Sequence, residues 1–300
     1  MGNIVKPIEH DYHTLRKEIY ALAGRYPFLH LARIGKSVMG RELLALQLGK
    51  AKSYLLIAAA FHGTERITAA VALRFAEQVC AAVAAGGDLT GIPIRRALKE
   101  RGLIILPMVN PDGCDIAIHG EKGCLGRAER IKRLCGGHFE EWNANGRGVD
   151  INHNFDAGWL ALKEKEKKAG IYGPSKKQYG GSRPVSEPET AALVSLCENI
   201  RFEHAIAFHS QGEVIYWSWG EKENKKGLKM AEIFAASSGY ALDVPLGLAL
   251  GGGFKDWFIE RFNRPAFTVE IGKGENPLPF LQVNEIYEKI REMLVLGILM

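Results

Sequence analysis

Two continuous apolar runs, at 54–60 and 103–109, dominate the pattern of hydrophobic and polar positions, and each is bounded by polar residues. Runs of this length are typical of strands that are buried on both faces of a sheet. Shorter apolar or alternating segments predict further strands at 43–48, 204–209, 213–217 and 266–271. The pattern therefore indicates a sheet whose central strands are covered on both sides.

Between the predicted strands, the apolar spacing changes to that of helices, which are expected at 12–25, 65–85, 225–238, 253–262 and 283–298. Strands that alternate with helices predict an α/β fold with a mostly parallel or mixed central sheet and helices on both faces. We expect one domain, 1–300. In such folds ligands bind beyond the carboxyl ends of the strands.

The remaining segments carry turn and cap signals. Asn110-Pro111-Asp112-Gly113 predicts a turn, and 114–185, rich in glycine and charge, predicts a long irregular segment. Ser186-Glu187-Pro188-Glu189 has proline and glutamate where a capping box has them, so a helix is expected to begin at Ser186.

Composition narrows the class of protein. Of 300 residues, 47% are hydrophobic and 24% charged, with a formal net charge of +5, which excludes intrinsic disorder. The mild charge and the lack of a nucleic-acid-binding motif argue against a nucleic-acid partner. No run approaches the roughly 18 apolar residues of a membrane span, and the first residues do not resemble a secretory signal. We therefore expect a cytoplasmic protein with no membrane partner.

The five cysteines allow free thiols, one disulfide, or a second metal site within 114–135; they are Cys80, Cys114, Cys124, Cys135 and Cys197. An odd count without any CxxC pair favours free thiols and a reducing compartment.

Residues that could bind a metal ion or take part in catalysis follow the ends of predicted strands. His62 and Glu65 come directly after the run at 54–60, and they are either metal ligands or a polar turn with a glutamate at a helix start. His209 ends the strand at 204–209, either as an ordinary strand-end histidine or as a third ligand. Two histidines and one glutamate would leave a fourth zinc position open for water, as hydrolytic sites do.

Two further features have a chemical and a structural interpretation. Glu270 lies in an apolar strand, where a carboxylate serves as a general base or in an ion pair. The segment 142–155 gathers amide, imidazole and guanidinium groups, which suit recognition of a carboxylate or oxyanion, or simply form Asx turns.

Taken together, these pieces resemble the zinc metallocarboxypeptidases, the carboxypeptidase A-like M14 peptidases. The resemblance rests on motifs in family order: YP at 26–27, IGKS and GRE within 34–42, HGTERIT at 62–68, NPDG at 110–113, GVDIN at 148–152, SEPET at 186–190, HS at 209–210, GGFKDW at 252–257, and Glu270. The stretches at 209–217 and 253–257 look most like the bacterial branch typified by γ-D-glutamyl-meso-diaminopimelate peptidase I.

The resemblance implies a carboxypeptidase-like fold and one zinc ion per chain, bound by His62, Glu65 and His209, with Glu270 as general base. It implies a zinc peptidase that hydrolyses peptidoglycan stem peptides at the γ-D-Glu–diaminopimelate bond, so the expected partner is a peptide substrate, a muropeptide. Asn143 stands where the family has an oxyanion-stabilising arginine, and Arg147 is nominated for that role. The substrate-binding residues carried over are Asn152, His153, Asn143 and Ser210.

Two departures from the family pattern bear on the substrate. Asn152-His153 replaces the usual Asn-Arg pair that holds a terminal carboxylate, and the segment 246–250 lacks the family's tyrosine. The sequence also shows neither a propeptide nor LysM repeats. The alternatives are a zinc carboxypeptidase for ordinary C-terminal residues, an N-acyl amino acid deacylase, and an inactive module that binds wall peptides. No oligomeric state is predicted.

Overall fold

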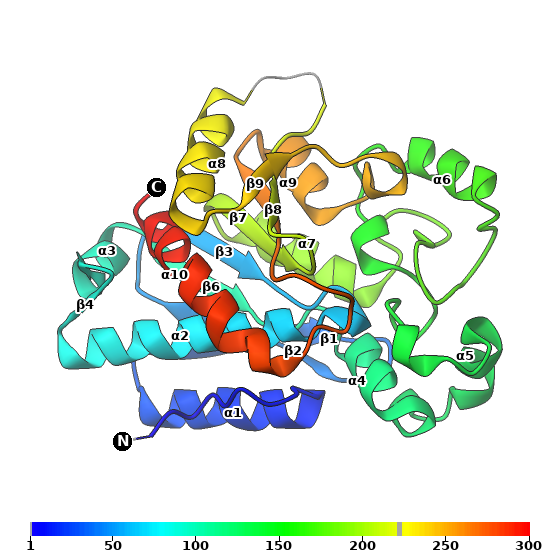
Figure 1. The fold of residues 1–300 in the computed structure, drawn as a ribbon, viewed down its shortest axis with the longest axis horizontal. Helices are drawn as coiled ribbons and strands as arrows, with labels where there is room; N and C mark the ends of the chain where they lie inside the picture. The colour runs from blue at the N-terminus through cyan, green and yellow to red at the C-terminus, as the bar shows by residue number, and fades with distance from the viewer. Residues whose placement is uncertain (1, 221–223) are drawn as a thin grey trace.

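A mixed eight-stranded sheet forms the centre of the computed structural model, which describes residues 2–220 and 224–300 (Figure 1). In spatial order its strands are β1 (His30–Lys36), β2 (Glu42–Leu48), β6 (Gly102–Leu106), β3 (Tyr54–Ala58), β7 (Phe202–His209), β10 (Ala266–Glu270), β8 (Val214–Tyr216) and β9 (Ala241–Asp243). The four central strands are mutually parallel, whereas β1–β2, β2–β6 and β10–β8 are antiparallel. The predicted mixed α/β class is therefore confirmed.

Helices cover both faces of the sheet. One face carries α1 (Tyr12–Arg25), α2 (Ile67–Ala85), α3 (Ile94–Glu100), α8 (Lys225–Ser238) and α10 (Val283–Leu299). The other face carries α7 (Pro188–Asn199) and α9 (Phe254–Phe262). In Figure 1, α2 and α10 cross in front of the strands. A small hairpin, β4 (Asp88–Leu89) and β5 (Ile92–Pro93), precedes α3.

The central strands explain why their sequences are apolar throughout. On β3, Leu55 and Ile57 join the core beneath α2 and α10, while Leu56 and Ala58 join the core on the side of α7 and α9. Successive side chains of a strand point to opposite faces, so a strand covered on both faces needs apolar residues at every position.

The helix α2 is by length and composition apolar enough to cross a membrane, with a mean hydropathy of 1.5 over its most apolar window. In the folded chain 72% of that window is buried. Its small residues, many of them alanine, pack against the sheet, which is how a central helix of an α/β core behaves.

Two predictions for the middle of the chain are wrong. Residues 110–113 do not form an isolated turn, because Asn110 caps α4 (Pro111–His119) through its side chain, which accepts a hydrogen bond from the Gly113 N–H. The segment 114–185 is not irregular throughout. It contains α5 (Ala128–Cys135), α6 (Trp159–Lys168) and short 3-10 turns. A small core of its own, which includes Ile131 and Trp142, stabilises the part that contains α5.

The helix start predicted at Ser186 is displaced by one residue. Glu187 is the N-cap of α7. The Ser186 hydroxyl donates to the Glu187 carboxylate and accepts from the Asn154 side chain, not from a helix N–H. Proline occupies the first turn as predicted. The prediction of free thiols is confirmed, because all five cysteines are buried and unpaired.

Candidate active site

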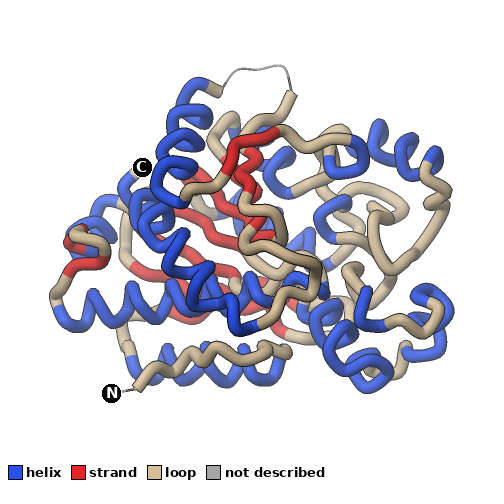
Figure 2. The backbone as a smooth tube through the Cα atoms, viewed as in Figure 1, coloured by secondary structure: helices blue, strands red, loops and turns tan. Residues whose placement is uncertain are grey.

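Three parallel strands deliver the site residues to one edge of the sheet. His62 follows β3, His209 ends β7, and Glu270 ends β10, where it is the register partner of His209. Carboxyl ends of parallel strands lie at the same edge, so residues more than two hundred positions apart in sequence meet there. Figure 2 shows long loops gathered over this part of the molecule.

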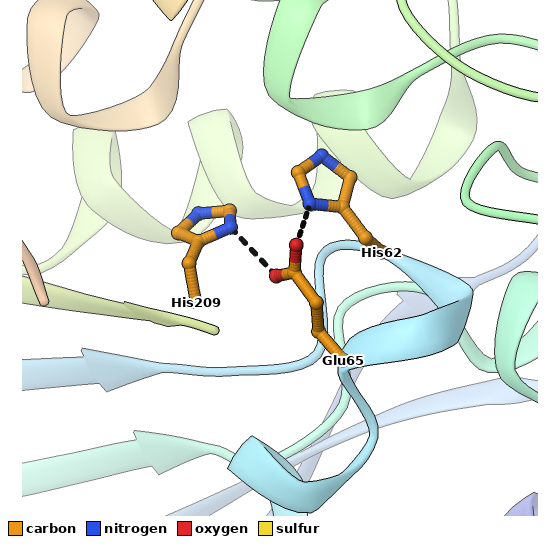
Figure 3. A group of neighbouring side chains, drawn as sticks. All are labelled: His62, Glu65 and His209. Carbon is orange, nitrogen blue, oxygen red and sulfur yellow. Dashed lines mark hydrogen bonds and ion pairs between the residues drawn. The ribbon is translucent and has the colours of Figure 1, made fainter. Parts of the chain in front are cut away.

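His62, Glu65 and His209 form a compact cluster (Figure 3). The Glu65 carboxylate faces both rings, with Oε1 2.8 Å from His62 Nδ1 and Oε2 2.9 Å from His209 Nδ1. The three ligand atoms all lie within 4.8 Å of one another. Two imidazole nitrogens and one carboxylate oxygen that converge in this way can share one metal ion.

Close backbone packing fixes the turn that carries His62 and Glu65. A Cβ at Gly63 would lie 2.2 Å from the carbonyl oxygen of Trp142 and 2.4 Å from that of Gly113. Only glycine therefore fits at this position, directly after His62. The hydroxyl of Thr68 donates to the Glu65 carbonyl and accepts from the Ala60 N–H, which ties the turn to the end of β3.

Asp150 holds His62 from the opposite side. Its Oδ1 lies 3.0 Å from His62 Nε2, and its Oδ2 accepts the Gln178 N–H. A neutral ring that donates from Nε2 has its lone pair on Nδ1, the atom that faces the cluster, and this neutral form is the one that binds metals. Burial alone would raise the pKa of Asp150, but His62 and His153 hold it well below its usual value.

The electrostatics of the cluster favour a cation at its centre. Burial by itself would lower the pKa of His62, yet Glu65 and Asp150 raise it well above its usual value. Burial would raise the pKa of Glu65, yet the two imidazoles lower it to about 2. His209 Nε2 is buried and has no hydrogen-bond partner among the described residues. The donor set fits zinc, and His62, Glu65 and His209 would hold it.

Glu270 lines the same cavity as the cluster. Burial and the nearby Glu65 carboxylate raise the pKa of Glu270 well above its usual value, whereas His62 opposes that rise. A carboxylate with a raised pKa takes and returns a proton more readily near neutral pH. The cavity has a volume of about 440 Å³, enough for a small peptide fragment.

The predicted substrate-binding residues Asn143, Asn152, His153 and Ser210 also line this cavity. Several of their polar groups have protein partners. The Asn143 side-chain oxygen accepts from the Thr64 N–H at 3.2 Å, and that of Asn152 accepts from the Phe254 N–H at 2.9 Å. The Ser210 hydroxyl donates to the Asn276 side chain at 2.8 Å.

Arg147 lies elsewhere. Its guanidinium is half-exposed, lies 3.4 Å from the Glu187 carboxylate, and is not among the groups that line the cavity. Its proposed oxyanion role therefore gains no support from its position. The side-chain oxygen of Asn145 accepts a hydrogen bond from the Arg147 N–H at 2.9 Å.

One amide joins the two sides of the site. The Asn110 side chain donates toward three carbonyl oxygens, those of Phe61, Asn143 and Ala144, at 3.0, 3.0 and 3.2 Å. The segment that leads to His62 and the loop that carries Asn143 are thus held by the same side chain.

Sequence reasoning missed several residues that line the cavity, namely Lys177, Gln178, Tyr216, Lys255, Asp256 and Asn276. Tyr216 enters from β8, beside Thr268 of β10. The segment around 246–250 contributes Ala249 to the cavity. The sequence did carry a signal for Lys255 and Asp256, because they form a charged pair within the otherwise apolar segment 252–259.

The family model described as zinc carboxypeptidase matches residues 15–295. The chain is 33% identical over 294 residues to γ-D-glutamyl-L-diamino acid endopeptidase 1 of Lysinibacillus sphaericus, covering 96% of this chain and 72% of that protein. It is also 33% identical over 282 residues to the uncharacterized protein YqgT of Bacillus subtilis, covering 93% of this chain and 74% of that protein.

Solved structures share the fold at low sequence identity. Thrombin-activatable fibrinolysis inhibitor superposes with a TM-score of 0.78 at 19% identity, over 99% of this chain and 76% of that chain. Murein-tripeptide amidase MpaA from Escherichia coli O157 superposes with a TM-score of 0.54 at 22% identity, over 89% of this chain and 91% of that chain. These matches confirm the carboxypeptidase-like architecture.

Proposed function

The chain belongs to the zinc carboxypeptidase (M14) family and is a hydrolase of that family, and we propose that it cleaves peptidoglycan stem peptides at the bond between γ-linked D-glutamate and diaminopimelate. One zinc ion per chain is part of the proposal. The observation that carries it is the meeting of His62, Glu65 and His209 within 4.8 Å, in a cavity that Glu270 also lines.

These residues divide the work of peptide hydrolysis. A zinc ion held by His62, Glu65 and His209 would polarise the scissile carbonyl and lower the pKa of a water molecule. Glu270 accepts a proton from the attacking water and donates it to the leaving amine. Asp150 keeps the His62 ring in the orientation and tautomer that ligation needs.

The choice of substrate is supported by the similarity to a protein named γ-D-glutamyl-L-diamino acid endopeptidase 1. His153, in place of the arginine usual in the family, affects how a terminal carboxylate is held. His153 Nδ1 lies 3.1 Å from the Gln178 carbonyl oxygen, which only accepts, so Nδ1 carries a proton. In its neutral form the ring then presents Nε2 as an acceptor. Such a ring lacks the charged fork of arginine, so it holds any terminal carboxylate, that of a terminal diaminopimelate included, less firmly than arginine does.

Mass spectrometry of L-Ala-γ-D-Glu-meso-diaminopimelate incubated with the purified protein tests the proposal, beside a blocked ordinary dipeptide with a free C-terminus. Release of free diaminopimelate, lost after treatment with a chelator and restored by about one equivalent of zinc, is the expected result. Cleavage of the blocked dipeptide alone would overturn the proposed substrate. Full turnover in metal-free protein would overturn the metal assignment.

The His153→Arg variant separates the two peptidase interpretations. If His153 lies at the position that would hold a terminal carboxylate, an arginine there adds a permanent two-pronged donor and improves cleavage of ordinary C-terminal substrates. Comparison of kcat/KM for the blocked dipeptide in the two proteins measures this. An unchanged value would show that His153 does not contact that carboxylate.

A further inference from the structure

A second hollow lies at the opposite edge of the sheet from the metal cluster. Its volume is about 320 Å³, within the range of roughly 300–1,000 Å³ in which small ligands bind. Leu48, which lines it, ends β2 and pairs with Leu103 at the amino end of β6. The metal cluster lies at the carboxyl ends of the parallel strands, and no described residue lines both cavities. In Figure 1 this hollow is beside α3, at the left of the view.

Apolar side chains form the inner surface of this hollow. Phe28 and Val83 are partly buried, and Leu48 and Leu98 are only 1% and 5% exposed. A surface that inserts into a membrane presents its apolar side chains outward, whereas the two leucines lie at the bottom of a hollow. The shape therefore suits a small ligand with an apolar body better than it suits a lipid surface.

Positive charge surrounds the apolar surface. Lys50, Arg95 and Lys99 line the hollow, and no acidic side chain of the described residues does. All three are exposed, and none forms an ion pair within 2–220 and 224–300. Arg95 donates from Nη2 to the Val83 carbonyl oxygen at 2.7 Å, which leaves most of its five N–H groups available. The hollow is therefore ready to receive a negative charge.

The backbone brings these charges together against their repulsion. Arg95 and Lys99 are four residues apart in α3, so they lie on one face, where like charges destabilise a helix. A Cβ at Gly49 would lie 2.5 Å from the Leu98 carbonyl oxygen, so only glycine lets the end of β2 approach α3 this closely. Lys50 follows Gly49 directly. An anion held among the three side chains would offset their repulsion.

The hollow continues toward the start of the chain. An adjoining hollow shares Phe28 and Arg95 with it and is also lined by small residues at the end of α2. The one carboxylate that lines it among the described residues, Glu77, accepts the N–H groups of Ile4 and Val5 at 2.6 and 3.1 Å. That negative charge is therefore already engaged, and a longer apolar tail has further surface to contact.

We propose that this hollow binds a free amphipathic carboxylate of the fatty-acid class, with its aliphatic chain against Phe28, Leu48 and Leu98. Its carboxylate lies between Lys50 and Lys99. A neutral apolar ligand would leave the cations uncompensated, and an inorganic anion would leave the apolar surface in contact with water. The site lies outside the catalytic cavity and does not depend on the proposed function.

Isothermal titration calorimetry of the purified protein with monomeric decanoate tests the proposal. Decanoate is expected to bind with a Kd below about 1 mM. Octanoate should bind about tenfold more weakly, because each buried methylene group strengthens binding roughly three- to fourfold. Decyltrimethylammonium has the same chain with the opposite charge and should not bind. Acetate carries the charge without the chain, and it controls for carboxylate binding at the metal cluster.

Two substitutions made together, Lys50→Met and Lys99→Met, should weaken decanoate binding at least about tenfold. Lys52→Met is the matched control, at an exposed lysine that does not line the hollow, and it should leave the Kd within about twofold of wild type. Thermal unfolding of each variant shows that the fold is kept.

Equal decanoate affinity in the double variant and the wild type would place the ligand elsewhere, the metal cluster included, and overturn the site. Equal affinity for octanoate and decanoate would overturn the apolar contact, and so would the absence of decanoate binding. Binding to vesicles of anionic phospholipid, without binding of monomeric decanoate, would identify a membrane-contacting surface and overturn the proposed ligand.

Discussion

The metal face and the recognition face of the cavity are built in different ways. The metal face, formed by His62, Glu65, His209 and Glu270, takes its positions from the ends of β3, β7 and β10. The recognition face, formed by parts of 143–153, 177–178 and 245–256, takes its positions from loops and from the first turn of α9.

The difference shows that two kinds of interaction position the residues of the two faces. A hydrogen-bonded sheet sets the spacing of strand ends, so the metal face needs few additional contacts. The recognition face depends on individual side-chain bonds, such as those of Asn152 to Phe254 and His153 to Gln178. One substitution in a loop can therefore change the substrate while the strand ends keep the reaction.

Glu270→Gln breaks the metal face most severely. An amide cannot accept the proton of the attacking water, so kcat is expected to fall by roughly 10² to 10⁴ while the bound zinc stays near one equivalent. Turnover and metal content of the same sample measure both, with the exposed Glu275→Gln as control. Retained turnover would place the base elsewhere.

Asp150→Asn tests how the recognition loop supports the metal face. Removing the charge that holds His62 is expected to weaken zinc binding by roughly 10- to 100-fold. Competition with a chelator at fixed pH gives the dissociation constant, and Asp156→Asn, at an exposed carboxylate nearby, should leave it unchanged. Equal affinity in the two variants would show that the two faces act independently.

Gly63→Ala disturbs the turn of the metal face without altering any ligand. The added methyl meets two backbone carbonyls well inside contact distance, and a loss of roughly 1–3 kcal/mol in the free energy of unfolding is expected. Gly24→Ala is the matched control, because nothing lies within 4 Å of its Cβ in α1, and a helical alanine should stabilise by up to about 1 kcal/mol. The free energies of unfolding of both variants, measured with denaturant, show whether the turn at Gly63 can accommodate the added methyl group.

Glu189 provides a further test of the comparison, because its buried carboxylate contacts the recognition face at Asn145. Its carboxylate accepts from the Val38 N–H and the Asn145 side chain. Burial, aided by the nearby Asp112 carboxylate, raises the pKa of Glu189 to about 7. The folded protein therefore keeps this proton after the unfolded chain has released it, so stability falls as pH rises from about 4.5 to 7.

Glu189→Gln cannot titrate, so the difference in stability between variant and wild type should move by about 3 kcal/mol in favour of the variant across that interval. Unfolding curves at several pH values measure this change. A difference that does not vary with pH would mean that Glu189 is ionised throughout.

The sequence predicted which residues meet at the metal face, and the reason is physical. His62 and His209 border apolar strands, and polar residues at such borders converge when the strands are parallel. The recognition face gave no such pattern. The placement of Arg147 depends on the Asn145 turn and on Glu187, and the burial of Lys255 depends on a carbonyl 37 positions away. The small core around Trp142 likewise joins separate segments of the chain, and its helix α5 is only eight residues long, so its apolar pattern covers little more than two turns.

The Asn110 side chain has a consequence for how relatives of this protein can diverge. Because it binds the carbonyls of Phe61, Asn143 and Ala144 together, insertions on either side of that contact would displace a ligand and a loop at once. Lineages that acquire new substrates should therefore accumulate length changes in the cavity segment around 245–253, and leave the segments joined by Asn110 at constant length.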